Sequence, residues 1–167
     1  MKLKLLASLC SAFVVSCSTS DPINTSKPDV LLEYLNQNVS SKVLGDIVSD
    51  QPQWFSILDH IESGVKNGDV VWLNIAAKLR SVSDAGGSLS LDFSVARGLP
   101  YEPELVLSGV DLGFSLNRLC TIPFIEEEQS VVDAFIAEAT TKLDELAVNG
   151  NGKAAECTKL MTKVHTD

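Results

Sequence analysis

Residues 88–95, with the sequence SLSLDFSV, decide the fold class of this chain, because two kinds of secondary structure fit their pattern. The odd-numbered positions are apolar and the even-numbered positions are polar, as in a half-buried β-strand. Leu91, Val95 and Leu99 also share one face of a helix, and Asp84 precedes them as a candidate N-cap. The sequence offers no second convincing strand, and an isolated strand is only marginally stable in water. We therefore predict a helix here and an all-α domain.

Apolar residues spaced three and four apart predict further helices before this stretch. Pro52 fits the first turn of one helix, the Asn-Gly pair at 67–68 fits its end, and Asp69 is a candidate N-cap for the next. Short connections make consecutive helices nearly antiparallel, so we expect Trp54 and Trp72 in one shared core. The predicted helices are two short ones from residue 29 onward with a break near 38–40, one with the apolar face Trp54, Phe55, Leu58, Ile61 and Val65, and one over 70–82.

The C-terminal half also shows helical spacing. Pro103 can begin a short helix through Ser108, and residues 112–120 supply another turn or two. The clearest element is a long helix after Pro123, which the NGNG sequence at 149–152 ends. Its predicted core stripe is Val132, Phe135, Ile136, Ala139, Leu143 and Leu146, and the last helix has Ala154, Cys157, Leu160, Met161 and Val164 on its apolar face. These elements predict an irregular bundle of about six to eight helices. A short HEAT-like stack of helical hairpins is the alternative, although no clean repeat period supports it.

The N-terminal residues follow the sequence pattern of a bacterial secretory signal. Two lysines precede an apolar run over residues 5–15, which is about half the length that a membrane-spanning helix needs. The segment Val14-Val15-Ser16-Cys17 resembles the lipobox of bacterial lipoproteins. This resemblance implies that residues 1–16 are a signal peptide and that the Cys17 thiol carries diacylglycerol as the first residue of the mature protein. An ordinary secretory signal is the alternative.

The segment after the predicted anchor is polar and rich in turn-forming residues. We expect residues 17–28 to be a flexible, lipid-anchored tether and residues 29–167 to form a single α-helical domain. Ser18 follows the anchor. In enterobacterial lipoproteins a residue other than Asp at this position implies passage to the outer membrane. We therefore expect the protein in the bacterial cell envelope, anchored in the lipid bilayer through Cys17 and facing the periplasm, with the outer membrane favoured over the inner.

The chain is acidic, with 22 Asp and Glu residues against 13 Lys and Arg residues and a formal net charge of −9. Loss of the two lysines in the signal peptide makes the mature domain more acidic still. The remaining basic residues are scattered singly from Lys27 to Lys163, so they form no patch in the sequence that could displace counterions from a nucleic acid. This charge pattern excludes nucleic acid as an expected partner and disfavours contact with anionic lipid headgroups.

The four cysteines leave one pair available for a disulfide. Cys10 lies in the signal peptide and Cys17 is the predicted lipid attachment site, which leaves Cys120 and Cys157. In an oxidising envelope an even pair predicts a disulfide, and two separate buried thiols are the alternative. With only two histidines and no C-x-x-C or H-x-x-x-H spacing, we expect no metal and no cofactor.

Candidate catalytic groups are few. Asp59-His60-x-Glu62 is the one local grouping of acids and a base, but neighbours on a helix diverge by about 100° per residue. Asp59 and His60 therefore cannot face each other, whereas Asp59 and Glu62 can share a solvated surface. No G-x-S-x-G elbow is present, so we expect no enzyme activity. The DAGG sequence at 84–87 has the composition of an anion site at a helix start, but a turn and cap is its expected role.

Glu126, Glu127 and Glu128 are the candidate partner-binding residues, and we expect them in the first turn of the long helix, where the helix dipole favours anions. With the anchor, the tether and the acidic surface, they predict a non-enzymatic envelope lipoprotein that binds another protein. An immunity-type inhibitor of a basic toxin is one form of this hypothesis. A scaffold or assembly lipoprotein of an envelope machine is the alternative, and an unrecognised hydrolase is a third.

Overall fold

The structure is a computed structural model, and it describes residues 24–37, 45, 47 and 51–164. The predicted signal peptide, Cys17 and most of the tether lie outside the described residues. Most of the short helix expected after the break near 38–40 lies outside them as well. The following account concerns the described residues alone.

The described residues are all-helical and contain no strand. This confirms the all-α fold class and the helix over residues 88–95. The helices are α1 (Pro28–Gln37), α3 (Gln51–Lys66), α4 (Val70–Val82), α5 (Ala85–Ala96), α6 (Pro103–Ser108), the 3₁₀ turn η1 (Gly109–Leu112), α7 (Leu116–Leu119), α8 (Gln129–Val148) and α9 (Gly152–Val164).

Two aspartates begin the central helices as the sequence predicts. Asp69 is the N-cap of α4 and accepts a hydrogen bond from the Val71 amide at 2.9 Å. Asp84 is the N-cap of α5 and accepts one from the Gly87 amide at 2.8 Å. The DAGG sequence is therefore a turn and a cap. Both caps satisfy amide groups that a helix start leaves without an intrahelical partner.

Helix α5 packs against α3, α4 and α7, so it meets neighbours on several sides. Leu91, Asp92, Ser94, Val95 and Ala96 are all buried in it. A helix buried around most of its circumference has no single apolar stripe, and this explains why its sequence alternates like a strand.

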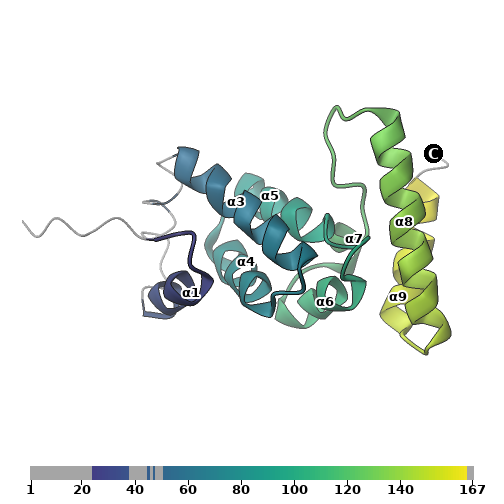
Figure 1. Cartoon of the computed structure of the whole chain (residues 1–167), viewed down its shortest axis with the longest axis horizontal. Helices are drawn as coiled ribbons and strands as arrows, with labels where there is room; N and C mark the ends of the chain where they lie inside the picture. The colour runs from purple at the N-terminus through teal and green to yellow at the C-terminus, as the bar shows by residue number, and fades with distance from the viewer. Residues whose placement is uncertain (1–23, 38–44, 46, 48–50, 165–167) are drawn as a thin grey trace, which may run out of the picture.

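The helices follow one another along the long axis of the molecule in an irregular bundle (Figure 1). Helix α1 packs on α4 at one end, α3, α4 and α5 form the middle, and the antiparallel hairpin of α8 and α9 stands at the other end against α6 and α7. Trp54 and Trp72 belong to one hydrophobic core, as the sequence predicts. The packing of α4 on α3 is close, since a Cβ atom on Gly64 would lie 2.0 Å from Cδ1 of Trp72.

Two local predictions are wrong. Phe55 does not belong to the buried face of α3, because its side chain is 56% exposed, whereas Ile57 is fully buried. The face that meets the core is set by helical geometry, which places Ile57 closer to Trp54 and Ile61 than Phe55 is. Glu126, Glu127 and Glu128 do not form the first turn of α8, because that helix begins at Gln129. Glu126 has a φ of 56°, in the left-handed region, which no right-handed helix tolerates.

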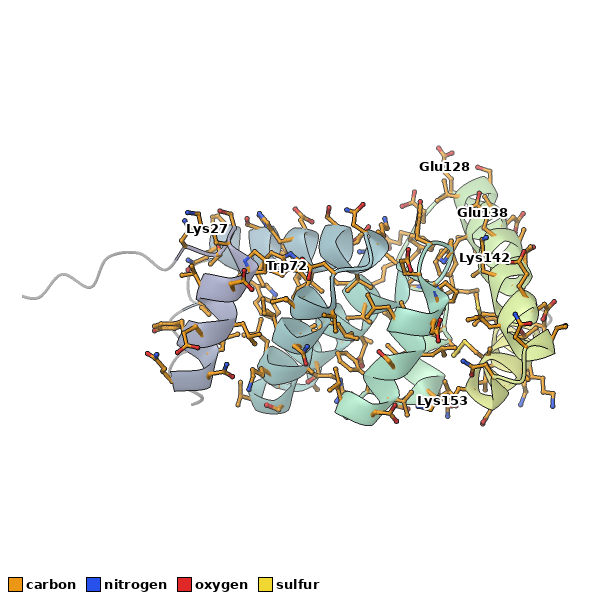
Figure 2. The ribbon with its side chains drawn as sticks, turned by 60° about the horizontal axis from the view of Figure 1, so that its bottom comes forward. Lys27, Trp72, Glu128, Glu138, Lys142 and Lys153 are labelled. Carbon is orange, nitrogen blue, oxygen red and sulfur yellow. A yellow bond between two sulfur atoms is a disulfide. The ribbon has the colours of Figure 1, made fainter. Side chains whose placement is uncertain are left out.

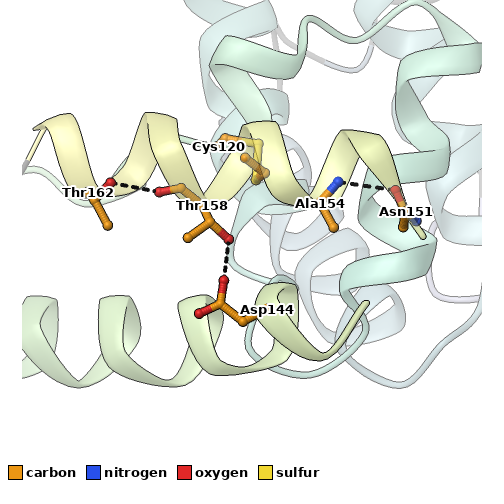
Figure 3. Close-up of a disulfide and its surroundings, with 7 residues drawn as sticks. Cys120, Asp144, Asn151, Ala154, Thr158 and Thr162 are labelled. Atoms are coloured by element: carbon orange, nitrogen blue, oxygen red, sulfur yellow. Dashed lines mark hydrogen bonds between the residues drawn. A yellow bond between two sulfur atoms is a disulfide. The ribbon is translucent and has the colours of Figure 1, made fainter. Parts of the chain in front are cut away.

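Cys120 and Cys157 form the predicted pair, with their sulfur atoms 2.06 Å apart. Both are buried, and they join the end of α7 to the middle of α9 (Figure 3). The hairpin is also held from within, because the Thr158 hydroxyl on α9 donates a hydrogen bond to Asp144 on α8 at 3.0 Å. The disulfide therefore attaches the whole α8–α9 hairpin to the body of the molecule.

Candidate functional site

A surface cavity lies between α8 and the adjoining ends of α3 and α5, and we call it the α8 groove. Its volume is about 550 Å³. Helix α3 contributes its last turns, the segment after α5 contributes a Pro-Tyr turn, and α8 contributes one long face. The groove is lined by Glu62, Lys66, Arg97, Pro100, Tyr101, Phe124, Glu127, Ser130, Val131, Ala134, Phe135 and Glu138.

An ion-pair cluster forms one wall of the groove. Glu62 accepts a hydrogen bond from Lys66 Nζ at 2.6 Å and another from Arg97 Nη1 at 3.0 Å. Arg97 Nε also donates to the Pro123 carbonyl at 3.1 Å. The cluster therefore connects α3, the end of α5 and the loop that leads to α8, and it fixes the width of the groove near that loop.

Each cation of this cluster also lies over an aromatic ring. Lys66 Nζ is 5.3 Å from the centre of the Tyr101 ring, and the Arg97 guanidinium is 5.5 Å from that of Phe124. Phe124 in turn meets Phe135 of α8 edge-on, with the ring centres 5.2 Å apart. Cation–π contacts and edge-to-face ring pairs are favourable geometries, so charge and apolar packing support each other here.

Glu62 is ionised within the cluster. Burial raises the pKa of its carboxyl, but the hydrogen bonds and positive charges of Lys66 and Arg97 outweigh burial and lower the pKa overall. A carboxyl with a lowered pKa carries no proton to donate at neutral pH. Glu62 therefore acts in this wall as a fixed negative charge.

The carboxylates on the α8 side of the groove have a different environment. Glu127 and Glu138 are exposed, and neither forms an ion pair with another of the described residues. Figure 2 shows Glu138 and Lys142 along the same helix. A smaller hollow of about 340 Å³ continues the groove along α8, and it is lined by Pro100, Ala137, Glu138, Thr141 and Lys142.

The three glutamates predicted to bind a partner, at positions 126–128, do not share one site in the structure. All three glutamates at 126–128 are exposed, but only Glu127 lines the groove. The Glu127 carboxylate accepts a hydrogen bond from the Glu128 amide at 3.3 Å, within the loop before α8.

The Asp59-His60-x-Glu62 grouping also diverges. Asp59 and Glu62 share a shallow hollow of about 450 Å³, as their spacing predicts. Glu62 is not simply solvated, however, because Lys66 and Arg97 hold it. His60 turns away from both acids, donating a hydrogen bond from Nδ1 to the Ser56 carbonyl and lying with its ring centre 5.5 Å from that of Trp72.

Two further properties concern only the part of the chain that the structure describes. No group of three or more His, Cys, Asp or Glu side chains there is arranged to hold a metal ion. No helix among the same residues combines the length and apolar character needed to cross a membrane.

Most of the groove has no signature in the sequence. Lys66, Arg97, Tyr101 and Phe124 carry no local motif, and Arg97 meets Glu62 across 35 positions of the chain. The one visible signal was the spacing of Glu62 and Lys66, which are four residues apart on one helix and can pair. Comparison with protein-family models, with curated proteins and with solved structures found no match to this chain.

Proposed function

We propose that this chain is a lipid-anchored protein of the bacterial cell envelope that acts by binding another protein rather than by catalysis. The anchor part of the proposal is supported by the lipobox resemblance at Val14-Val15-Ser16-Cys17 and by the signal-like run before it. Acyl chains of a lipoprotein contribute about 0.8 kcal/mol per buried methylene, so two or three of them hold a protein firmly.

The single observation that carries the binding part is the α8 groove. It combines exposed aromatic and aliphatic side chains with unpaired carboxylates on one elongated surface. Surfaces of this composition are typical of protein interfaces, where an apolar centre is surrounded by polar groups. On the opposite wall, Glu62 forms ion pairs with Lys66 and Arg97, so these three charged groups already have partners within the protein.

The anchor is tested by mass spectrometry of the membrane fraction from cells that express the full chain. We expect an N-terminal peptide that begins at Cys17 and carries acyl chains. The Cys17→Ser chain should lose this mass and should not yield a mature N-terminus at residue 17. Unmodified Cys17 inside an uncleaved peptide would contradict the proposal.

The binding function is tested by affinity capture of the full chain from envelope extract after reversible crosslinking in the cell. We expect one discrete protein partner, captured less efficiently as salt rises, because salt screens attraction to an acidic surface. A chain that captures nothing beyond the tag control would sink the proposal. A gene for a basic secreted toxin beside this one would identify the inhibitor form, and a secretion operon would identify the assembly form.

A further inference from the structure

We infer that the α8 groove binds a cationic, partly apolar segment of the partner, with Glu138 and Glu127 pairing with its Lys or Arg residues while its apolar side chains cover Tyr101 and Val131. This inference rests on the proposed protein-binding function, and it names the chemistry of the partner and the surface that receives it.

The shape of the groove suits a peptide segment. Its α8 wall follows one helical face through Ser130, Ala134, Glu138 and Thr141, which are spaced three and four apart. From residue 130 to residue 141 there are eleven steps of 1.5 Å, a length of about 16 Å, which is enough for three turns of a partner helix or about five extended residues. Ser130 and Ala134 have small side chains, so a second backbone can approach this wall closely.

The apolar surface of the groove is exposed although large side chains contribute to it. Tyr101 is 54% exposed and Val131 is 42% exposed. Covering such side chains contributes about 25 cal/mol for each Å² of apolar area removed from water, so the partner segment must carry apolar residues of its own.

Charge decides the remaining chemistry. Lys66 and Arg97 are both engaged by Glu62 and by aromatic rings, and Lys142 in the adjoining hollow pairs with Glu145 at 3.6 Å, so each cation along the groove already has an anionic partner. Glu127 and Glu138 have no cationic partner among the described residues, and the whole chain carries a formal charge of −9. The groove therefore presents unpaired negative charge to an occupant, and it disfavours both an acidic segment and a second copy of this chain.

The charge arm of the test uses two fluorescent peptides of 16 residues that share one pattern of leucines, one with lysine and the other with glutamate at the polar positions. We expect the lysine peptide alone to bind the full chain in fluorescence anisotropy. Glu138→Lys should weaken binding about three- to tenfold, because one attractive pair is replaced by a repulsion. The matched control is Glu156→Lys, an identical charge change at an exposed residue of α9 that does not line the groove, and it should weaken binding less than twofold.

The shape arm uses Ala134→Trp, which places a large side chain in the groove on an exposed helical position. We expect binding of the lysine peptide to fall at least tenfold, while Glu156→Trp leaves it unchanged. Circular dichroism melts establish that each variant is folded. Equal binding by Ala134→Trp and its control, or equal binding of the two peptides, would overturn the inference.

The captured envelope partner separates this inference from the proposed function. Capture that survives Glu138→Lys and Ala134→Trp places the partner elsewhere, so the groove inference falls and the proposed function stands. If the chain captures no envelope protein but still binds the lysine peptide selectively, the proposed function is wrong, whereas the preference of the groove for a cationic, partly apolar segment stands. If the wild-type chain sediments as a dimer and Ala134→Trp as a monomer, the occupant is a second copy and the inference is wrong.

Discussion

Glu62 connects more elements of the structure than any other acid beside the groove. It accepts hydrogen bonds from Lys66 on its own helix and from Arg97 at the end of α5. Since Arg97 also donates to the Pro123 carbonyl, Glu62 is linked through Arg97 to the loop before α8. Glu62 therefore helps to hold the groove together through these hydrogen bonds, and this role does not require it to contact a bound segment.

We expect Glu62→Gln to lower the free energy of unfolding at pH 7 by about 1–2 kcal/mol, as charge-assisted hydrogen bonds are lost. Because the pKa of Glu62 is lowered in the folded protein, its stabilisation is present above the pKa of the unfolded chain and is lost as pH falls through the folded value. The difference between wild type and variant should therefore shrink through the acid range. Urea unfolding between pH 7 and pH 3 measures it, and a difference that grows on acidification would contradict this account.

Gly64 is the second residue whose identity the packing dictates. A Cβ atom there would lie 2.0 Å and 2.3 Å from two ring carbons of Trp72, far inside van der Waals contact. We expect Gly64→Ala to destabilise the protein by about 2–3 kcal/mol, although alanine favours helices in general. Gly152→Ala is the control, because a Cβ atom on that helical glycine meets nothing within 4 Å. Equal losses of melting temperature in the two variants would show that the close approach of α3 and α4 does not require glycine at position 64.

At the scale of elements, helices α4 and α5 are held together by a buried ion pair. Arg80 Nε on α4 donates to Asp92 on α5 at 2.6 Å, and the Asp92 side chain is 3% exposed. The same arginine reaches the Gly113 carbonyl at 3.3 Å and lies 5.3 Å from the centre of the Phe114 ring. This pair therefore also positions the segment after η1.

We expect Asp92→Leu alone to cost about 3 kcal/mol or more, because it leaves the charge of Arg80 without its partner. The double variant Arg80→Met with Asp92→Leu should be the more stable of the two, since it removes both charges and adds apolar volume. Chemical denaturation of wild type, the single variant and the double variant measures this. A double variant less stable than Asp92→Leu would show that the remaining contacts of Arg80 matter more than the pair.

The elements differ in how far their sequences determine them. Asp69 and Asp84 are visible as caps because capping is local, and the caps place α4 and α5 correctly. The start of α8 is not visible, because the left-handed conformation of Glu126 has no signature in that residue type. Arg97 was missed for another reason, since a contact across 35 residues depends on the fold and leaves no periodicity in the chain.

At the scale of the whole molecule, the bond between Cys120 and Cys157 decides whether the α8 wall stays in place. It closes a loop of 37 residues that contains all of α8. In the loop-entropy model, closing such a loop stabilises a protein by about 4 kcal/mol. The body and the hairpin also meet through the pair of Lys153 on α9 and Asp111 on η1, at 2.8 Å, but both side chains are exposed and such pairs contribute little.

We expect reduction to lower the melting temperature and to weaken peptide binding at the groove, because the α8–α9 hairpin is then held to the body only by packing and the exposed pair of Lys153 and Asp111. Cys120→Ser and Cys157→Ser should each reproduce the effect, and the double variant should add little, since all three remove the same link. Calorimetry with and without reductant gives the first quantity, and anisotropy gives the second. Thiol labelling of both cysteines in the folded, unreduced chain would contradict the bond.

Helix α8, which forms one wall of the groove, stands at the opposite end of the molecule from α1 (Figure 1), and this has a consequence for how the protein would meet its partner. If Cys17 carries the lipid that we propose, the anchor precedes α1 and confines the molecule to a layer next to the membrane, while the α8 wall of the groove lies at the other end of the described chain. The rate of encounter then depends on the concentration of the partner within that layer. The length and stiffness of the tether set the thickness of the layer. On this proposal, a change in the length of the tether alters the distance from the membrane at which the groove meets a partner, and it leaves every residue that lines the groove unchanged.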